Sequence, residues 1–157
     1  MRLQVTEGLV GGAVAAVVSG IPSTIHALAT GRSPLDTVEA AGNVVLPASA
    51  PRPLLIAAAV PTHLALSLGW GAVLGATLPR RHTTAWGAAA GLAIAALDLG
   101  TVGRLRPKIR RLPHVPQVLD HLAYGAVVGW VVSACRPGRV DGTASPRRRA
   151  PGHGPTP

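Results

Sequence analysis

Four long stretches of this chain carry almost no charge, and this pattern limits what it can fold into more than any other feature. They cover residues 8–29, 54–78, 84–103 and 117–135, each about 19 to 25 residues long. A helix of about 20 apolar residues crosses the hydrocarbon core of a bilayer. A soluble helix needs a polar face toward water, which these stretches lack. The sequence therefore predicts an all-α fold, with four transmembrane helices in an antiparallel bundle.

The segments outside these stretches hold nearly all the charged residues, which make up only 13% of the chain. We expect residues 1–135 to form one four-span membrane domain and residues 136–157 to form a disordered basic tail. The first stretch also has the outline of a cleavable signal peptide. However, Glu7 interrupts its basic start, and the spanning length favours a retained helix. Residues 34–46 are either a short amphipathic helix at the membrane interface or an ordered loop.

Prolines interrupt the helical pattern in two ways. Pro22 and Pro61 lie inside the first two stretches and predict kinks, which would widen that half of the bundle into a shallow vestibule. Residues 104–116 contain three prolines and five basic residues. Because proline forbids a continuing helix, we expect this segment to run along the membrane surface in turns.

The net charge of +9 raises the question of a nucleic-acid partner. The basic residues flank apolar stretches, and the chain has no Phe, one Tyr and three Trp to stack on bases. The predicted partner is therefore a lipid bilayer with anionic head groups, and no nucleic acid. Eight basic residues fall on one side of the predicted bundle and seven on the other, an excess too small to set the orientation. Of the two orientations, the one with both termini in the cytoplasm is favoured.

Glycines recur four residues apart in each predicted helix. Such pairs let helix backbones approach closely in lipid, so they predict a compact bundle or a tight homo-oligomer. Two stretches, "HLALSLGWGAVLG" and "HLAYGAVVG", also suggest two related helix hairpins. The packing glycines are Gly8, Gly12, Gly71, Gly75, Gly87, Gly91, Gly125 and Gly129.

The ionisable residues inside the stretches all belong to one half of the bundle. In an alternating arrangement, the ends of the first and third helices face the same side as the starts of the second and fourth. An ionisable group within a membrane faces the bundle interior with a partner, and Asp98 could pair with His121, with His63 or with Arg104. The candidate polar pocket consists of Asp98, His121, Asp120, His63, His26, Ser23 and Thr24.

The sequence leaves several interpretations of this pocket open. Polar contacts that tie the helices together are favoured over a proton or cation path through Asp98 and His121. A metal site built from His63, His121, Asp98 and Asp120 lacks any local ligand spacing. Haem ligation by His63 and His121 would need the two histidines to lie at the same depth in the membrane, and it would need more aromatic residues than the chain contains. No metal and no cofactor is therefore predicted.

Four segments carry a resemblance to a known group of proteins. They are "GIPST" at residues 20–24, "AAG" at 40–42, "GLAIAALDLG" at 91–100 and "PQVLDHLAYGAVVG" at 116–129. With them, about residues 5 to 135 resemble an uncharacterised family of small integral membrane proteins of high-GC actinobacteria. The resemblance implies a four-helix membrane protein and transfers no activity and no catalytic residue.

Two function classes remain after these arguments. The favoured one is a non-enzymatic, multi-pass component of a bacterial plasma membrane, which packs with itself or with a membrane partner. The alternative is a small proton- or cation-coupled transporter or channel that uses Asp98 and His121. An enzyme is disfavoured because no nucleophile–base or metal motif is recognisable.

Overall fold

The computed structural model describes residues 2–135, and the predicted tail at 136–157 lies outside the described residues. Within residues 2–135 the chain is helical and forms no strand. Four segments are long and apolar enough to cross a membrane: Gln4–Ala29, Arg52–Thr77, Thr83–Leu105 and His114–Cys135. The predicted all-α fold is therefore confirmed. The helices are α1 (Arg2–Val18), α2 (Ile21–Ala29), α3 (Leu35–Gly42), α4 (Arg52–Thr77), α5 (Thr83–Gly100), α6 (Val102–Leu105), α7 (Pro107–Arg110) and α8 (His114–Cys135).

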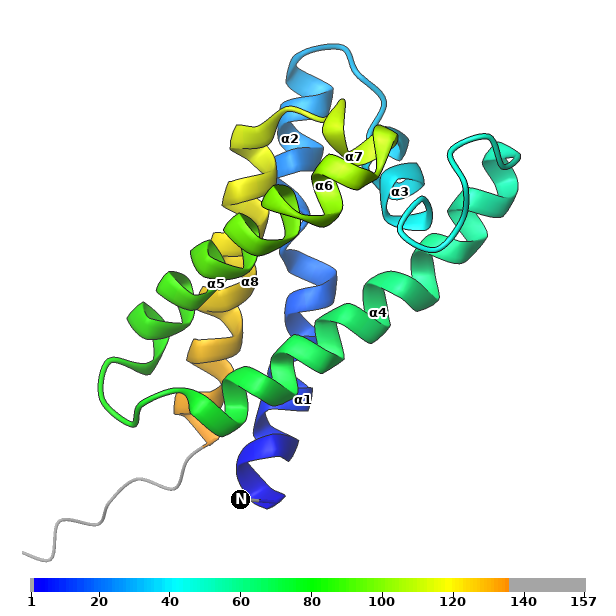
Figure 1. Ribbon diagram of the computed structural model, residues 1–157. Coiled ribbons are helices and arrows are strands. Elements are labelled where there is room, and N and C mark those ends of the chain that lie inside the picture. The colour runs from blue at the N-terminus through cyan, green and yellow to red at the C-terminus, as the bar shows by residue number, and fades with distance from the viewer. Residues whose placement is uncertain (1, 136–157) are drawn as a thin grey trace, which may run out of the picture.

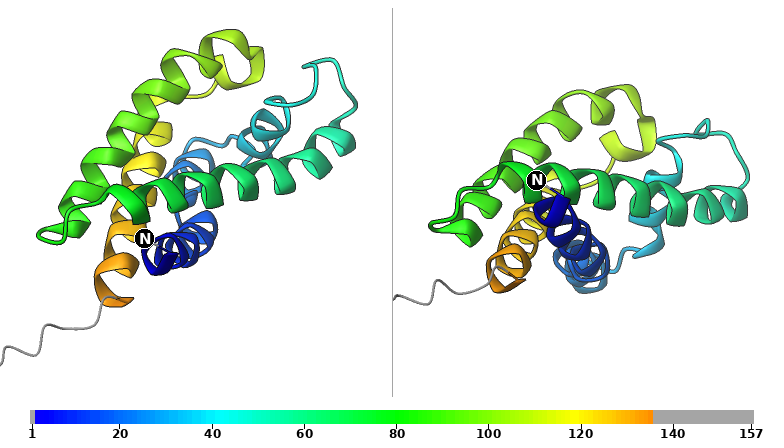
Figure 2. Two further views of the ribbon diagram at one scale, coloured as in Figure 1. Left: turned by 60° about the horizontal axis from the view of Figure 1, so that its bottom comes forward. Right: turned by 90° about the horizontal axis from the view of Figure 1, so that it is seen from below.

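The long helices alternate in direction. Both ends of the described chain lie at one end of the bundle, together with the short turn between α4 and α5 (Figure 1). The opposite end carries α2, α3, α6 and α7, and we call it the loop-rich end (Figures 1 and 2). The molecule consists of two antiparallel hairpins, because α1 packs mainly on α4 and α5 packs mainly on α8. Helix α1 also packs on α8, which joins the hairpins.

The first hairpin crosses at glycines from both helices. A Cβ atom on Gly8 would overlap the carbonyl oxygen of Gly71 and lie 2.8 Å from the Cα of Gly75. A Cβ on Gly12 would lie 3.2 Å from the Cα of Gly71. The backbones of α1 and α4 therefore touch at a distance that leaves no room for a side chain.

The second hairpin crosses in the same way. A Cβ on Gly87 would overlap the carbonyl oxygen of Gly125 and lie 3.0 Å from the Cα of Gly129. A Cβ on Gly91 would lie 3.3 Å from the Cα of Gly125. Gly87 of α5 is therefore equivalent in position to Gly8 of α1, and Gly125 of α8 is equivalent to Gly71 of α4.

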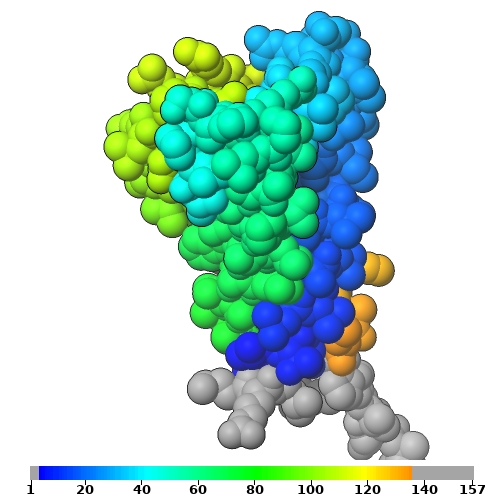
Figure 3. Space-filling view, turned by 90° about the vertical axis from the view of Figure 1, so that its right-hand side faces the viewer, coloured from blue at the N-terminus to red at the C-terminus, as the bar shows by residue number. Residues whose placement is uncertain are grey.

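Small residues line the points where the helices of each hairpin cross, and many large apolar residues are exposed. Ala15 and Ser67 are buried, whereas the exposed fractions are 82% for Val17, 68% for Val60 and 60% for Trp130. Figure 3 shows α1 and α2 running beside α4 along one side of the molecule. A central cluster lies where the two hairpins meet. It contains Ala15, Leu74, Leu78, Ile94, Tyr124, Val128 and Val132.

The two internal prolines act differently. The first span breaks between Val18 and Ile21, and Pro22 is the second residue of α2, where its missing N–H costs no helical hydrogen bond. In contrast, α4 continues through Pro61 as one helix. The sequence predicted a kink at Pro22, and the structure instead has a complete break in the helix just before it.

The segments between the hairpin arms are more helical than expected. Residues 104–116 were expected to form turns, but α6, α7 and the start of α8 occupy most of them. Pro107 is the first residue of α7 and Pro116 lies in the first turn of α8, positions at which proline is tolerated. Helix α8 consequently begins at His114, before the predicted start at residue 117. Helix α3 forms within residues 34–46, and its contact with a membrane stays a prediction.

Candidate functional site

The break between α1 and α2 lies at the centre of a polar cluster in the loop-rich half of the bundle. Asp120 is six residues into α8, which places it roughly 9 Å from the start of that helix at 1.5 Å per residue. Ser23 is six residues before the end of α2, at a similar depth. The groups that meet at the break come from four helices, with side chains from α4 and α8 and backbone groups from α1 and α2.

Asp120 reaches from α8 to the start of α2. Its Oδ1 accepts a hydrogen bond of 2.9 Å from the backbone N–H of Ser23. Gly20 precedes α2 and provides no side-chain cap, so this N–H would otherwise lack a partner. A carboxylate at a helix N-terminus is also favoured by the helix dipole. Asp120 therefore serves as an N-cap supplied by a different helix.

His63 bonds to the other side of the same break. Its Nε2 lies 2.9 Å from the carbonyl oxygen of Ala16, near the end of α1. Ala16 is among the last residues of α1, whose carbonyl groups lack helical partners. With its proton on Nε2, the imidazole donates to this carbonyl. Side chains from α4 and α8 thus satisfy backbone groups on both sides of the break.

Asp98 and His121 form a pair within the second hairpin. The Nε2 atom of His121 lies 3.3 Å from Oδ2 of Asp98, and its Nδ1 lies 2.8 Å from the carbonyl oxygen of Gln117. Both ring nitrogens therefore face acceptors, and only the doubly protonated imidazolium donates to both. The side chains retain exposed fractions of 34% for Asp98 and 22% for His121. Of the three partners considered for Asp98, the structure provides His121.

Two residues of the predicted pocket lie apart from this cluster. Thr24 is exposed on α2, and His26 lines a small surface pocket with Arg32 and Asp36, which only Ser23 of the cluster also lines. Arg104, considered above as a partner of Asp98, lies on α6 and lines a separate groove. Neither cavity includes the carboxylates or the imidazoles of the cluster in its lining. Within residues 2–135, no group of three His, Cys, Asp or Glu side chains could hold a metal ion.

One interhelical hydrogen bond was missed by the sequence analysis. The buried hydroxyl of Tyr124 on α8 donates to the carbonyl oxygen of Ser67 on α4. The sequence shows a single tyrosine in an apolar helix, and its hydroxyl needs an acceptor when buried. That requirement predicts a hydrogen bond but does not identify its acceptor.

An ionic network at the loop-rich end was missed as well. Glu39 on α3 accepts from Arg52 Nε at 2.6 Å and from Lys108 Nζ at 2.8 Å. The backbone N–H of Lys108 also donates to Asn43 Oδ1, at 3.3 Å. The hydrogen bond from Lys108 and the one from Arg52 hold the pKa of Glu39 below its usual range, although burial opposes them. A sequence signal existed, because only Asp36 and Glu39 offset seven basic residues in the segments of this end.

Comparison with protein-family models, curated protein sequences and solved structures found no match for this chain.

Proposed function

We propose that this chain is a multi-pass integral membrane protein without enzymatic activity, which packs with itself or with a membrane partner. The observation that carries the proposal is that glycines occupy the helix crossings while many large apolar side chains are exposed on the outer faces of the spans. Helices in lipid gain little from burying apolar side chains against each other, and small residues that permit close approach take over that role. In water, the same outer faces would form a large exposed apolar patch.

The polar cluster supports a non-enzymatic role. Asp120 binds the N–H of Ser23, and His63 binds the carbonyl of Ala16. These contacts complete a broken helix, which is how irregular backbone is tolerated at membrane depth. We infer that small-xxx-small packing at the glycines holds each hairpin and that the polar cluster joins the first hairpin to α8.

We propose a bacterial plasma membrane as the location, on the basis of the family resemblance. Anionic head groups are the expected neighbours of the basic residues that flank the spans. The proposed partners are therefore the bilayer itself and either a second copy of this chain or another membrane protein.

Cysteine labelling tests the membrane assignment. Single cysteines are placed by Arg32→Cys at the loop-rich end and by Arg81→Cys at the opposite end, each in a Cys135→Ser background. A membrane-impermeant maleimide added to spheroplasts is expected to label one position, and both after permeabilisation. If the protein inserts in both orientations, each position is labelled to about half. Complete labelling of both positions in intact spheroplasts would contradict the four-span arrangement.

Asp98 and His121 favour one second candidate, a proton- or cation-coupled carrier. Aspartate beside histidine is a pairing that proton relays use, and both side chains are partly exposed. Transporters also build their sites at discontinuous spans, and the first span here is interrupted between α1 and α2. Reconstitution in liposomes with a pH-sensitive dye separates the two proposals. A proton flux that is present in the wild type and absent in Asp98→Asn would establish the carrier. Equal, background-level leakage from both supports the non-enzymatic component.

A further inference from the structure

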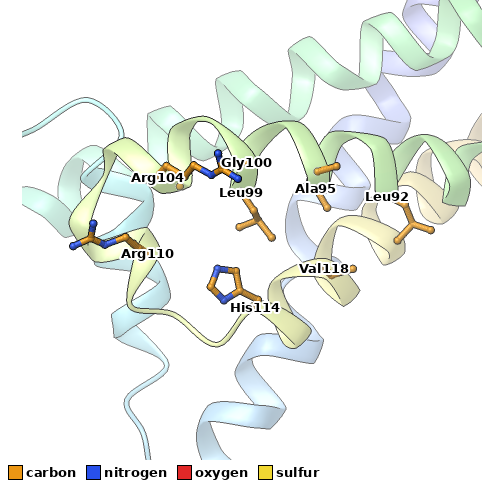
Figure 4. Close-up of a pocket in the computed structure, with 10 residues that line it drawn as sticks. Leu92, Ala95, Leu99, Gly100, Arg104, Arg110, His114 and Val118 are labelled. Carbon is orange, nitrogen blue, oxygen red and sulfur yellow. The ribbon is translucent and has the colours of Figure 1, made fainter.

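A groove of about 400 Å³ runs along the outer side of the second hairpin, apart from the polar cluster. It lies between α5 and α6 on one side and the start of α8 on the other (Figure 4). The floor is apolar and the lining contains three basic residues and no carboxylate. Figure 4 shows the basic side chains at one end of the groove and Leu92 and Val118 at the other.

The floor has the shape of a slot along α5. Leu92, Ala96 and Leu99 recur three and four residues apart and so lie on one face of the helix. Small residues, including Gly100, line the slot, and a Cβ on Gly100 would meet no atom within 4 Å. From Leu92 to Gly100 it extends roughly 12 Å along the helix axis at 1.5 Å per residue. These dimensions and this polarity suit an extended hydrocarbon chain.

The rim is positively charged and has no internal counter-charge. Arg104 belongs to α6, Arg110 to α7, and His114 begins α8. In the part of the chain that the structure describes, neither arginine forms an ion pair with a carboxylate. Arginine presents a planar fork of N–H donors that matches phosphate oxygens. The rim therefore suits a phosphate group.

The rim and the floor are arranged as the parts of a membrane lipid would be. The basic residues lie at the loop-rich end of the third and fourth spans, where head groups are expected, and the floor extends toward the middle of α5. We propose that this groove binds one anionic phospholipid, with its phosphodiester at the basic rim that Arg104 and Arg110 provide and an acyl chain along the floor. The proposal rests on the membrane assignment made above. A choline head group shares the phosphate but adds a cation that this rim repels.

Native mass spectrometry of the purified full chain in detergent tests the proposal. The probes are dioleoylphosphatidylglycerol, dioleoylphosphatidylcholine and inorganic phosphate, each added separately. We expect one retained phosphatidylglycerol molecule, and about tenfold weaker retention in the double variant R104Q/R110Q. The matched variant R80Q/R81Q removes two exposed charges at the opposite end and should bind like the wild type. Binding in detergent is independent of the labelling experiment, so the two proposals can fail separately.

Filling the slot gives a second readout that leaves the charges in place. Gly100→Leu adds a side chain where the structure has open space, and it should reduce phosphatidylglycerol retention. Gly69→Leu adds the same bulk to α4, where a Cβ also meets no atom within 4 Å, and should not reduce it. Equal retention of phosphatidylcholine, or equal losses in the two arginine variants, would overturn the proposal. Displacement of the lipid by inorganic phosphate, with no effect of Gly100→Leu, would instead identify a free-anion site.

Discussion

The two hairpins cross in the same register but differ where the helices continue beyond the crossing. Eleven residues after Gly8 the first hairpin has Ser19, and eleven residues after Gly87 the second has Asp98. Four residues before Gly71 and Gly125 stand Ser67 and His121, respectively. The serines are each 5% exposed, whereas the Asp98 and His121 side chains form a partly exposed pair.

This difference separates two physical requirements. Close backbone packing needs glycine at fixed positions in both hairpins, because any side chain there meets backbone atoms. The polar positions beyond the crossing are free to differ, provided that each group finds a partner. The first hairpin breaks its leading helix and uses Asp120 and His63 to satisfy the ends. In the second hairpin, α5 continues through Asp98, and the Asp98 carboxylate pairs with His121 on α8, the other helix of the same hairpin.

The largest expected effect comes from filling the crossing points. Gly71→Ala in the first hairpin and Gly125→Ala in the second place a methyl group against a backbone carbonyl of the facing helix. Overpacking at such sites costs about 2 kcal/mol, so both variants should unfold at clearly lower temperature in detergent. Losses of similar size would show that the two crossings are equivalent.

Gly69→Ala is the matched control for this comparison. It lies two residues from Gly71 on the same helix, and its Cβ would meet no atom within 4 Å. Its unfolding temperature in detergent should equal or exceed that of the wild type, because alanine has a higher helix propensity than glycine. If Gly69→Ala and Gly71→Ala lose the same stability, the helices do not cross as the structure describes.

Sequence reasoning predicted the parts of this fold that depend on short-range patterns. The length of the stretches without charged residues identified four spans, and Pro22 indicated an irregularity in the first span. The same reasoning could not assign partners across helices. It placed Asp120 and His63 in the same half of the bundle, but it could not give the direction that each side chain faces, which depends on how the helices rotate when they pack. Glu39 was missed for the same reason, because Lys108 is far away in the chain.

The second effect concerns the break in the first hairpin. Asp120→Ala removes the acceptor for the Ser23 N–H and should cost about 1 kcal/mol, the scale of helix N-caps and of interhelical hydrogen bonds in membranes. Asp120→Asn keeps a side-chain oxygen and should retain most of the stability. Thermal unfolding of both variants in detergent measures the difference. Equal losses would mean that the charge, and not the hydrogen bond, supports the break.

The third effect tests whether one hairpin's polar pair can be replaced by the other's. Asp98→Ser with His121→Ser gives the second hairpin the two serines of the first. Each single change removes one partner, whereas the double change removes both. A double-mutant cycle in the free energy of unfolding should therefore show a coupling of about 0.6 kcal/mol between the two residues. Unfolding of the wild type, both single variants and the double variant provides the measurement. Strictly additive losses would mean that Asp98 and His121 do not interact.

The smallest effect concerns the connections between the arms of the hairpins. The first connection provides Glu39, and the second contains Lys108 and no carboxylate, so this ion pair joins the two at the loop-rich end. The pKa of Glu39 is lowered by hydrogen bonds from Lys108 and Arg52, against the effect of burial. A depressed carboxyl pKa stabilises the folded state above the unfolded pKa, and the contribution is lost as pH falls through the folded pKa.

Glu39→Gln should therefore lower the unfolding temperature at pH 7 and have no effect once acid has protonated Glu39 in the wild type. The change should be small, because Arg52 is more than half exposed and water screens its charge. Unfolding in detergent between pH 7 and pH 3 measures it. Asp36→Asn serves as the control, since Asp36 lies exposed on the same helix without an ion pair among the described residues. A difference between Glu39→Gln and the wild type that stays constant across this pH range would show that Glu39 acts through packing and not through its charge.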